Sequence, residues 1–289
     1  MTPASRIVRT TLARPTRLIQ GIGLHSGRPA SVLVRPAPSG AGLIVVDSAS
    51  GQEIPATAQN VVDTSRCTQL GVGGIVVQTV EHVLSALAGC GVDDAIIESF
   101  GGEMPAVDGS ARPFADAVLM AGVTEQPDGD VPFLTVGQAH LLTHGSSVFL
   151  VEPSDAFRIK VVLDYPSHAF IGTQVAVYSG GETSYIDEIA PARTYGFLHE
   201  VEALRSRGLA LGASADNALV LSDDGYATRR RFDNELARHK LLDMIGDLAL
   251  AGRRICAQIT AIRPGHAGNT ALACSLLLWA NTHVGGSGE

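Results

Sequence analysis

The chain has 289 residues, of which 45% are hydrophobic and 17% charged, and its net charge is -8 at pH 7. This composition is typical of a soluble protein long enough for two domains, and the negative charge argues against a nucleic-acid partner. No apolar run approaches the roughly 20 residues that span a bilayer, and the basic N-terminus lacks the apolar core of a secretory signal. Four cysteines without a C-x-x-C pair favour a reducing cytoplasm over a disulfide framework.

The first part of the chain predicts a sheet followed by a helix. RLIQGIG, ASVLVRPA and GLIVVD alternate apolar and polar positions, as strands with one solvent-exposed face do. In QTVEHVLSALAGCG, an apolar stripe at helical spacing follows Thr79, a good N-cap, and two glycines end it. Glu81 and His82 therefore fall in the first helical turn. A histidine there is more often a capping or surface residue, unless partners elsewhere make it a metal ligand.

The next elements place a boundary near the middle of the chain. DDAIIESF predicts a strand, and residues 115–122 predict a second helix. Strands outnumber helices, which favours an α+β architecture over a doubly wound sheet. Residues 125–132 are polar and rich in helix and strand breakers, so we expect two domains, 1–126 and 131–289.

The second half repeats the order of strands followed by helices. FLTVGQAHLL, SSVFLVEP and FRIKVVLDYP predict three strands, and ICAQITAI a fourth between helices over 232–252 and about 267–281. This order suggests that one layered unit was duplicated. A strand-helix-strand insertion is expected at about 193–221, with Gly208 ending its helix. The terminal residues 284–289 are expected to be disordered.

The helix over 232–252 carries a polar stripe. His239, Asp243 and Asp247 are spaced at i, i+4 and i+8 and so line up on one side, away from the leucines. A histidine and an aspartate one turn apart can offer a nitrogen and an oxygen to one zinc ion, about 2.0–2.2 Å away. The alternative is a solvated helix face that carries one histidine.

A catalytic zinc site usually has three protein ligands and one open position. His82, His239 and Asp243 form such a set, with Glu81 beside a ligand and able to take a proton from a water molecule that zinc acidifies to a pKa of about 7. His266 lies in the loop RPGHAG before the last helix and could protonate a leaving nitrogen. On its own it could equally be a loop histidine without a role.

Two further side chains complete the hypothesis. Asp247, one turn beyond the proposed carboxylate ligand, could orient His266 and favour its charged form. Thr194 could donate its hydroxyl to a developing oxyanion. The sequence establishes the residue types and their helical spacing. That these side chains lie close together in space is inferred from them.

Five segments resemble one known family, in its order and spacing and over nearly the whole chain. They are TVEHVLSALAGCGVDDAIIE, MPAVDGSARPF, ARTYGF, RHKLLDMIGDLALAG and PGHAGN. The chain resembles the UDP-3-O-acyl-N-acetylglucosamine deacetylases, zinc amidases of the committed step of lipid A synthesis. The resemblance implies an α+β fold of two similar layered domains, each a sheet packed on helices, with the active site between them.

The resemblance also implies a role for individual residues. His82, His239 and Asp243 would bind the zinc, Glu81 would be the general base, and His266 the general acid.

Further roles follow from the same resemblance. Asp247 would be the partner of the general acid, and Thr194 would contact the carbonyl oxygen. Lys240 would contact the phosphate side of the substrate, and Tyr195 and Phe197 would line the sugar and nucleotide pocket.

The resemblance places two more features at the site. His25, in the LHSG motif, would lie near the active centre. The insertion at about 193–221 would form a hydrophobic passage for the acyl chain, with Leu204, Leu209 and Leu211 as candidate lining residues. Ordinary core packing is the alternative for these leucines.

The predicted function is therefore zinc-dependent hydrolysis of the N-acetyl group of UDP-3-O-(3-hydroxyacyl)-N-acetylglucosamine, releasing acetate and a free amine. A set of two histidines and one aspartate also accepts Fe²⁺. We expect a cytoplasmic monomer without a nucleic-acid partner. The alternatives are a zinc deacylase for another nucleotide sugar, and a non-catalytic nucleotide-sugar-binding or zinc-stabilised protein. Glu81 and His266 argue against the latter, since a structural zinc site needs neither.

Overall fold

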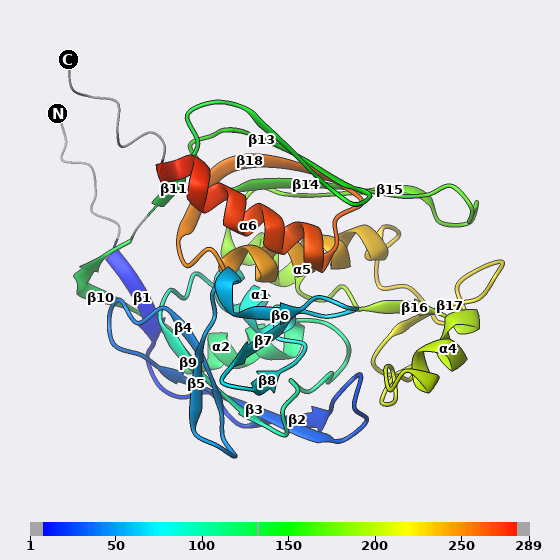
Figure 1. Ribbon diagram of the computed structural model, residues 1–289, viewed down its shortest axis with the longest axis horizontal. Helices are drawn as coiled ribbons and strands as arrows, with labels where there is room; N and C mark the ends of the chain where they lie inside the picture. The colour runs from blue at the N-terminus through cyan, green and yellow to red at the C-terminus, as the bar shows by residue number, and fades with distance from the viewer. Residues whose placement is uncertain (1–7, 132, 282–289) are drawn as a thin grey trace.

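The computed structural model describes residues 8–131 and 133–281, and residues 284–289, expected to be disordered, lie outside these ranges. Two mixed β-sheets form the outer layers, and helices fill the space between them (Figure 1). At the centre, α1 (Glu81–Gly89) packs against α5 (Glu235–Ala249). The expected α+β architecture is confirmed.

One outer layer is built from the N-terminal half of the chain. Its strand order is β2-β3-β9-β4-β5, with β4 and β9 parallel and the other neighbours antiparallel. Buried and half-buried residues alternate along β3, where Val32 and Val34 face the helices. The three strands predicted before residue 50 are confirmed. The strands of this sheet are β2 (Ile19–Ile22), β3 (Pro29–Pro36), β4 (Leu43–Asp47), β5 (Gln52–Pro55) and β9 (Ala95–Phe100).

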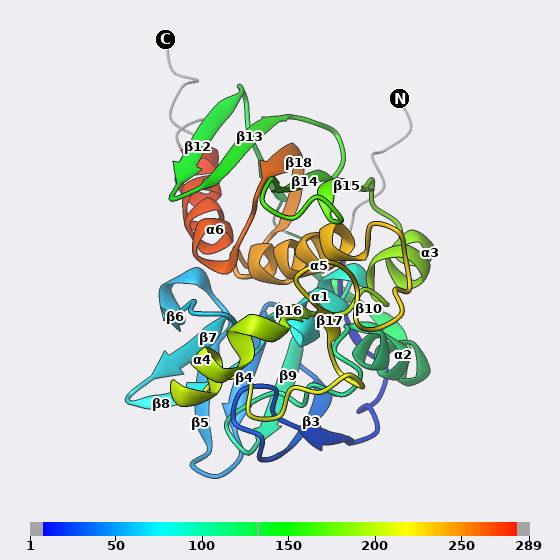
Figure 2. The ribbon, with the colours of Figure 1, turned by 90° about the vertical axis from the view of Figure 1, so that its right-hand side faces the viewer.

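Two helices cover the inner face of this sheet (Figure 2). The second, α2 (Arg112–Ala121), begins three residues before the predicted start. The prediction that Thr79 caps α1 is wrong, because Val80 precedes the helix and no side chain caps it. Thr79 instead has a φ of 60°, and its hydroxyl donates to the buried Glu103 carboxylate at 3.3 Å.

The other outer layer comes from the C-terminal half. Its strand order is β12-β13-β18-β14-β15, and β11 pairs with β18. The prediction of one strand from FLTVGQAHLL is wrong: residues 136–139 separate two strands that pair with different neighbours. The strands of this sheet are β11 (Phe133–Thr135), β12 (His140–His144), β13 (Ser147–Pro153), β14 (Arg158–Tyr165), β15 (Gly172–Tyr178) and β18 (Arg254–Ile262). The last helix, α6 (His266–Asn281), packs beside α5.

Between the halves, the polar segment expected as a boundary forms strand β10 (Val123–Asp130). It pairs antiparallel with β1 (Val8–Leu12). Backbone hydrogen bonds form this strand, and they do not depend on the polarity of its side chains. The insertion contains β16 (Tyr195–Phe197), α4 (Val201–Ser206) and the parallel partner β17 (Leu219–Leu221), as predicted. Gly208 follows α4 with a φ of 75°, which fits the expected helix end.

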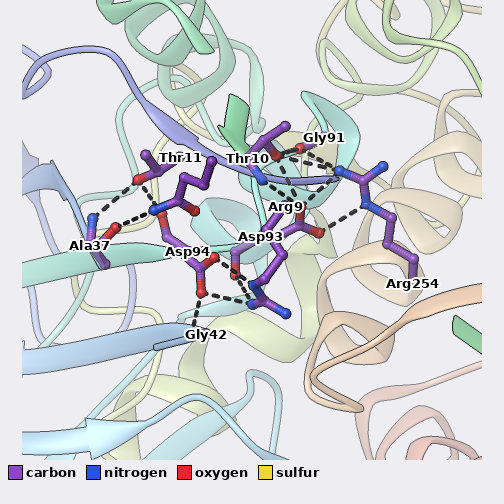
Figure 3. A network of polar contacts seen from close by, with 10 residues as sticks. Arg9, Thr10, Thr11, Ala37, Gly42, Gly91, Asp93, Asp94 and Arg254 are labelled. Atoms are coloured by element: carbon purple, nitrogen blue, oxygen red, sulfur yellow. Dashed lines mark hydrogen bonds and ion pairs between the residues drawn. The ribbon is translucent and has the colours of Figure 1, made fainter. Parts of the chain in front are cut away.

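A network of polar contacts that includes an ion pair between Arg254 and Asp93 joins the two halves of the chain (Figure 3). Arg254 of β18 donates to both carboxylate oxygens of Asp93, at 2.9 and 2.8 Å. Beside it, Arg9 makes a two-pronged contact with the buried Asp94 at 2.7 Å. Fork-like arginine–carboxylate pairs fix orientation as well as distance. This network holds β18 against the loop that follows α1.

Candidate active site

The polar stripe of α5 is buried. His239, Asp243 and Asp247 have exposed fractions of 2%, 1% and 0%. The leucines on the opposite side of α5 are buried as well, because the helix lies between α1 and the C-terminal sheet. The interpretation of the stripe as a solvated face is therefore wrong. A buried stripe of titratable groups needs charge partners or a metal ion.

His82 of α1 completes a three-residue cluster with His239 and Asp243, whose ligand atoms all lie within 4.8 Å of one another. Asp243 Oδ1 is 3.6 Å from Nε2 of His82 and 3.3 Å from Nε2 of His239. Among the described residues, this oxygen is buried without a hydrogen-bond partner. Such an atom is costly unless a cation satisfies it. Two nitrogens and one carboxylate oxygen are the ligands of catalytic zinc sites, so the cluster fits a metal ion.

Neighbouring groups keep His239 and Asp243 in their ligand forms. His239 Nδ1 donates to the carbonyl oxygen of Ala192 at 3.1 Å, which leaves the lone pair on Nε2. Burial lowers the pKa of His239 to about 3, so its ring is neutral. Burial raises the pKa of Asp243, but the charges of Lys240 and His266 hold it well below its usual range. Lys240 Nζ donates to Asp243 Oδ2 at 2.9 Å.

Glu81 lies beside the cluster, in the first turn of α1 as predicted. Its side chain is 3% exposed, and burial raises the pKa of its carboxyl group. The backbone N–H of Thr68 donates to Glu81 Oε2 at 3.0 Å. A carboxylate with a raised pKa is a better general base at neutral pH.

His266 is the first residue of α6, which begins one residue before the predicted start at about 267. Its Nδ1 lies 3.0 Å from Asp247 Oδ2, and its Nε2 lies 3.8 Å from Asp243 Oδ2. Burial lowers the pKa of His266, but these two carboxylates raise it more, to about 9. The side chain is thus held in its protonated form, as a general acid requires.

Two partners of Asp247 were not predicted. Asn269 Nδ2 donates to Asp247 Oδ2 at 2.9 Å, and the hydroxyl of Thr68 donates to Oδ1 at 2.5 Å. Both are buried with no exposed surface. Asn269 lies one turn after His266 on α6, a spacing that could have indicated it. Nothing in the sequence around Thr68 distinguishes it from an ordinary strand threonine.

The segment after Ala192 lies against the cluster. The Tyr195 ring faces the His239 ring at 6.2 Å, and Lys240 Nζ lies 5.7 Å from the centre of the same tyrosine ring. Thr194 stands between Ala192 and Tyr195, and its backbone N–H donates to Gly109 at 2.7 Å. These contacts place residues 192–195 along the His239 side of the metal cluster.

Phe197 lies further along the same strand and is 7% exposed. Its ring is 4.6 Å from the His168 ring and 6.0 Å from the Tyr165 ring. The hydroxyl of Tyr165 hydrogen-bonds the hydroxyl of Tyr195 at 3.1 Å. Phe197 thus belongs to an aromatic wall that begins at Tyr195 and leads away from the cluster.

His25 is 6% exposed, and the charges of His266 and His82 are near enough to influence it. Burial lowers its pKa, so the ring is neutral. Its backbone N–H donates to Glu103 at 2.7 Å, and its Nδ1 accepts the N–H of Ala210 at 3.4 Å. Nε2 therefore carries the proton, and among the described residues it has no partner. The LHSG turn thus links the insertion to the site.

The comparison with known proteins distinguishes an enzyme from a non-catalytic binding protein. Residues 9–278 match the model of the family described as UDP-3-O-acyl N-acetylglycosamine deacetylase. The chain belongs to this deacetylase family. It is therefore a hydrolase that acts on an amide, and the family is one of metalloenzymes.

Curated members of the family show the same relationship over most of their length. The chain is 42% identical over 259 residues to the UDP-3-O-acyl-N-acetylglucosamine deacetylase of Anaeromyxobacter dehalogenans, covering 89% of this chain and 83% of the relative. It is 42% identical to the enzyme of the same name from Myxococcus xanthus, covering 87% and 81%. It is 40% identical to the enzyme of the same name from Acidithiobacillus ferrooxidans, covering 89% of this chain and 86% of the relative. Within the described residues, no helix of the deacetylase is long and apolar enough to cross a membrane.

Proposed function

We propose that this deacetylase removes the N-acetyl group of UDP-3-O-(3-hydroxyacyl)-N-acetylglucosamine and releases acetate and the free amine, in the committed step of lipid A biosynthesis. One observation carries the proposal. A cluster of His82, His239 and Asp243 is flanked by two acid–base groups, Glu81 and His266, that a structural metal site does not need. Hydrolysis of an amide requires such a pair, one group for the water and one for the leaving nitrogen.

His82, His239 and Asp243 would hold the metal ion, and we propose Zn²⁺. The two nitrogens and one oxygen suit zinc, and they also suit Fe²⁺. When bound, the ion supplies Lewis-acid chemistry, because it polarises a carbonyl group and makes a water molecule more acidic.

The side chains of the site would then move two protons. Glu81 accepts a proton from the attacking water, because its raised pKa makes the carboxylate a stronger base. His266 donates its Nε2 proton to the departing amine, while Asp247 holds the ring through Nδ1 at 3.0 Å. The hydroxyl of Thr194, on the segment beside His239, stabilises the carbonyl oxygen as negative charge develops there.

The remaining residues would position the substrate. Lys240 and Tyr195 face the same side of the cluster and would contact the phosphate and sugar, with Phe197 further along the wall. The insertion would accommodate the acyl chain.

The burial of three leucines supports this role of the insertion. Leu204 and Leu209 are only half-buried, and Leu211 is 48% exposed. Core packing alone would bury them more fully. Leu211 is also joined to the active centre, since its backbone N–H donates to the carbonyl oxygen of His25 at 3.1 Å.

We further infer two domains, 1–126 and 131–289, with the site between them. Two observations support this division: one metal ligand and the base come from α1, and the other ligands and the acid come from α5 and α6. Four free cysteines agree with a reducing cytoplasm, and we expect a monomer.

The test measures release of free amine from UDP-3-O-acyl-N-acetylglucosamine and from UDP-N-acetylglucosamine, which lacks the acyl chain. The proposal predicts a much larger kcat/KM for the acylated substrate, because binding energy from the chain supports the chemical step. Equal turnover of the two substrates would point to another nucleotide sugar. Absence of turnover in folded, zinc-loaded protein would contradict the proposal.

A further inference from the structure

Thr68 touches both acid–base assemblies of the proposed reaction. It lies just before β7 (Gln69–Val72), and it has no exposed surface. Its backbone N–H donates to Glu81 Oε2 at 3.0 Å, and its hydroxyl donates to Asp247 Oδ1 at 2.5 Å. The same hydroxyl oxygen lies 3.3 Å from His266 Nδ1. One buried residue of the N-terminal half thus contacts groups that come from α1, α5 and α6.

From these contacts we infer that Thr68 is a positioning residue of the deacetylation reaction, an inference that rests on the proposed function. Its hydroxyl fixes the Asp247 carboxylate and, through it, the ring of His266. Because Thr68 has no exposed surface, it is not placed to touch the substrate. Its effect on the reaction passes through Asp247 and His266.

The hydrogen-bond directions at Asp247 carry this inference. The carboxylate oxygens only accept, so Oδ2 receives the Nδ1 proton of His266 at 3.0 Å and an Nδ2 proton of Asn269 at 2.9 Å. The Thr68 hydroxyl proton is directed to Oδ1, which leaves its oxygen able only to accept from His266 Nδ1. Both oxygens of Asp247 are then satisfied, and the plane of the carboxylate is fixed. With the Nδ1 proton held in this way, His266 Nε2 is the nitrogen that faces Asp243, at 3.8 Å.

Other contacts hold Thr68 in place. Its carbonyl oxygen accepts the N–H of Val80, just before α1, at 3.3 Å. The preceding Cys67 is also fully buried. Thr68 is therefore fixed against the start of the helix that carries Glu81. Its hydroxyl thus couples the position of this helix to that of Asp247 on α5.

The experiment compares three zinc-loaded proteins: wild type, Thr68→Val and Thr68→Ser. Valine keeps the shape of threonine and removes the hydroxyl, whereas serine keeps the hydroxyl. For Thr68→Val we expect kcat to fall about 10- to 100-fold, the usual cost of losing an outer hydrogen-bond partner, with KM and zinc content little changed. Thr68→Ser should recover most of kcat. Thr11→Val is the matched control, because Thr11 is also buried and donates its hydroxyl at 2.7 Å, but to the backbone of Asp94 away from the site.

A second readout does not depend on turnover. In nitrogen-15 NMR spectra, the Nδ1 proton of His266 should give a sharp signal in wild type and in Thr68→Ser, and exchange with solvent should broaden it in Thr68→Val. This signal reports on His266 even if another nucleotide sugar is the substrate, so failure of the inference is distinguished from failure of the proposed function. The inference is overturned by an unchanged signal in all three proteins, by wild-type kcat in Thr68→Val, or by a loss in Thr68→Ser as large as that in Thr68→Val.

Discussion

Gly246 of α5 lies directly against the backbone carbonyl oxygen of Glu81 on α1. A Cβ atom at position 246 would be 2.1 Å from that oxygen and 3.1 Å from the backbone nitrogen of Ser85. No side chain can move aside there, because the neighbouring atoms are backbone. The absence of a side chain at Gly246 therefore sets how close the two ligand-bearing helices come.

Gly246→Ala should push α1 and α5 apart. We expect a loss of about 1–3 kcal/mol in the free energy of unfolding, as overpacked sites show. Zinc affinity should fall too, since His82 and the α5 ligands would separate. Gly225→Ala is the control, because position 225 has open space around it. Urea unfolding and zinc titration measure both effects, and wild-type values in Gly246→Ala would contradict the proposed helix contact.

Glu81→Gln should separate catalysis from metal binding. The amide keeps the size of the carboxylate but cannot accept the proton of the attacking water, so kcat should fall about 10²- to 10⁴-fold. The ligand atoms are untouched, and the zinc content should stay at one ion per chain. Glu53→Gln, at an exposed position of β5, provides a control for the change of charge. A Glu81→Gln protein with near wild-type kcat would remove Glu81 from the role of base.

The pair of His266 and Asp247 predicts a pH dependence. The pKa of His266 is raised from 6.5 to about 9, so its stabilising charge is fully present below about pH 6.5 and is lost as the pH rises through about 9. If the protonated ring is the general acid, kcat falls on the same alkaline side. Asp247→Asn removes the largest interaction that raises the pKa. The alkaline limb of the kcat profile should therefore move to lower pH, and a limb that stays in place or moves upward would contradict the assignment.

Arg193 and Glu235 form a buried ion pair at the start of α5. Arg193 Nε donates to Glu235 Oε1 at 2.8 Å, and the two side chains are 9% and 0% exposed. Arg193→Met would leave the carboxylate buried without its charge partner, at a cost of about 3–5 kcal/mol in the free energy of unfolding. Arg230→Met, which removes surface contacts with Asp233 and with the Tyr226 ring, should cost far less. Equal unfolding midpoints for the two variants in urea would be inconsistent with this account.

Local periodicity was sufficient to predict much of the site. The spacing of His239, Asp243 and Asp247 determines that they share one side of a helix, and the structure places them there. The residues around Glu81 and His266 likewise predicted the first turn of α1 and the start of α6. The residue types at these positions then indicated metal and acid–base chemistry.

Long-range pairing accounts for what could not be predicted. Thr68 and Asp247 are 179 positions apart, and no local pattern relates them. The same holds for β10. Its polar residues indicate a loop, but its backbone pairs with β1, which lies at the opposite end of the N-terminal half of the chain. Thr79 was misread as a cap because its residue type suits that position, whereas its hydroxyl binds Glu103. Contacts of this kind depend on the whole fold.

The role of the metal ion is tested by removing it and adding it back. Protein stripped with a chelator is assayed for amine release from UDP-3-O-acyl-N-acetylglucosamine, and again after addition of one equivalent of Zn²⁺, with circular dichroism recorded at each stage. We expect the activity to disappear while the fold remains, and to return with one zinc ion per chain. Full activity in folded, metal-free protein would show that His82, His239 and Asp243 do not form a catalytic metal centre.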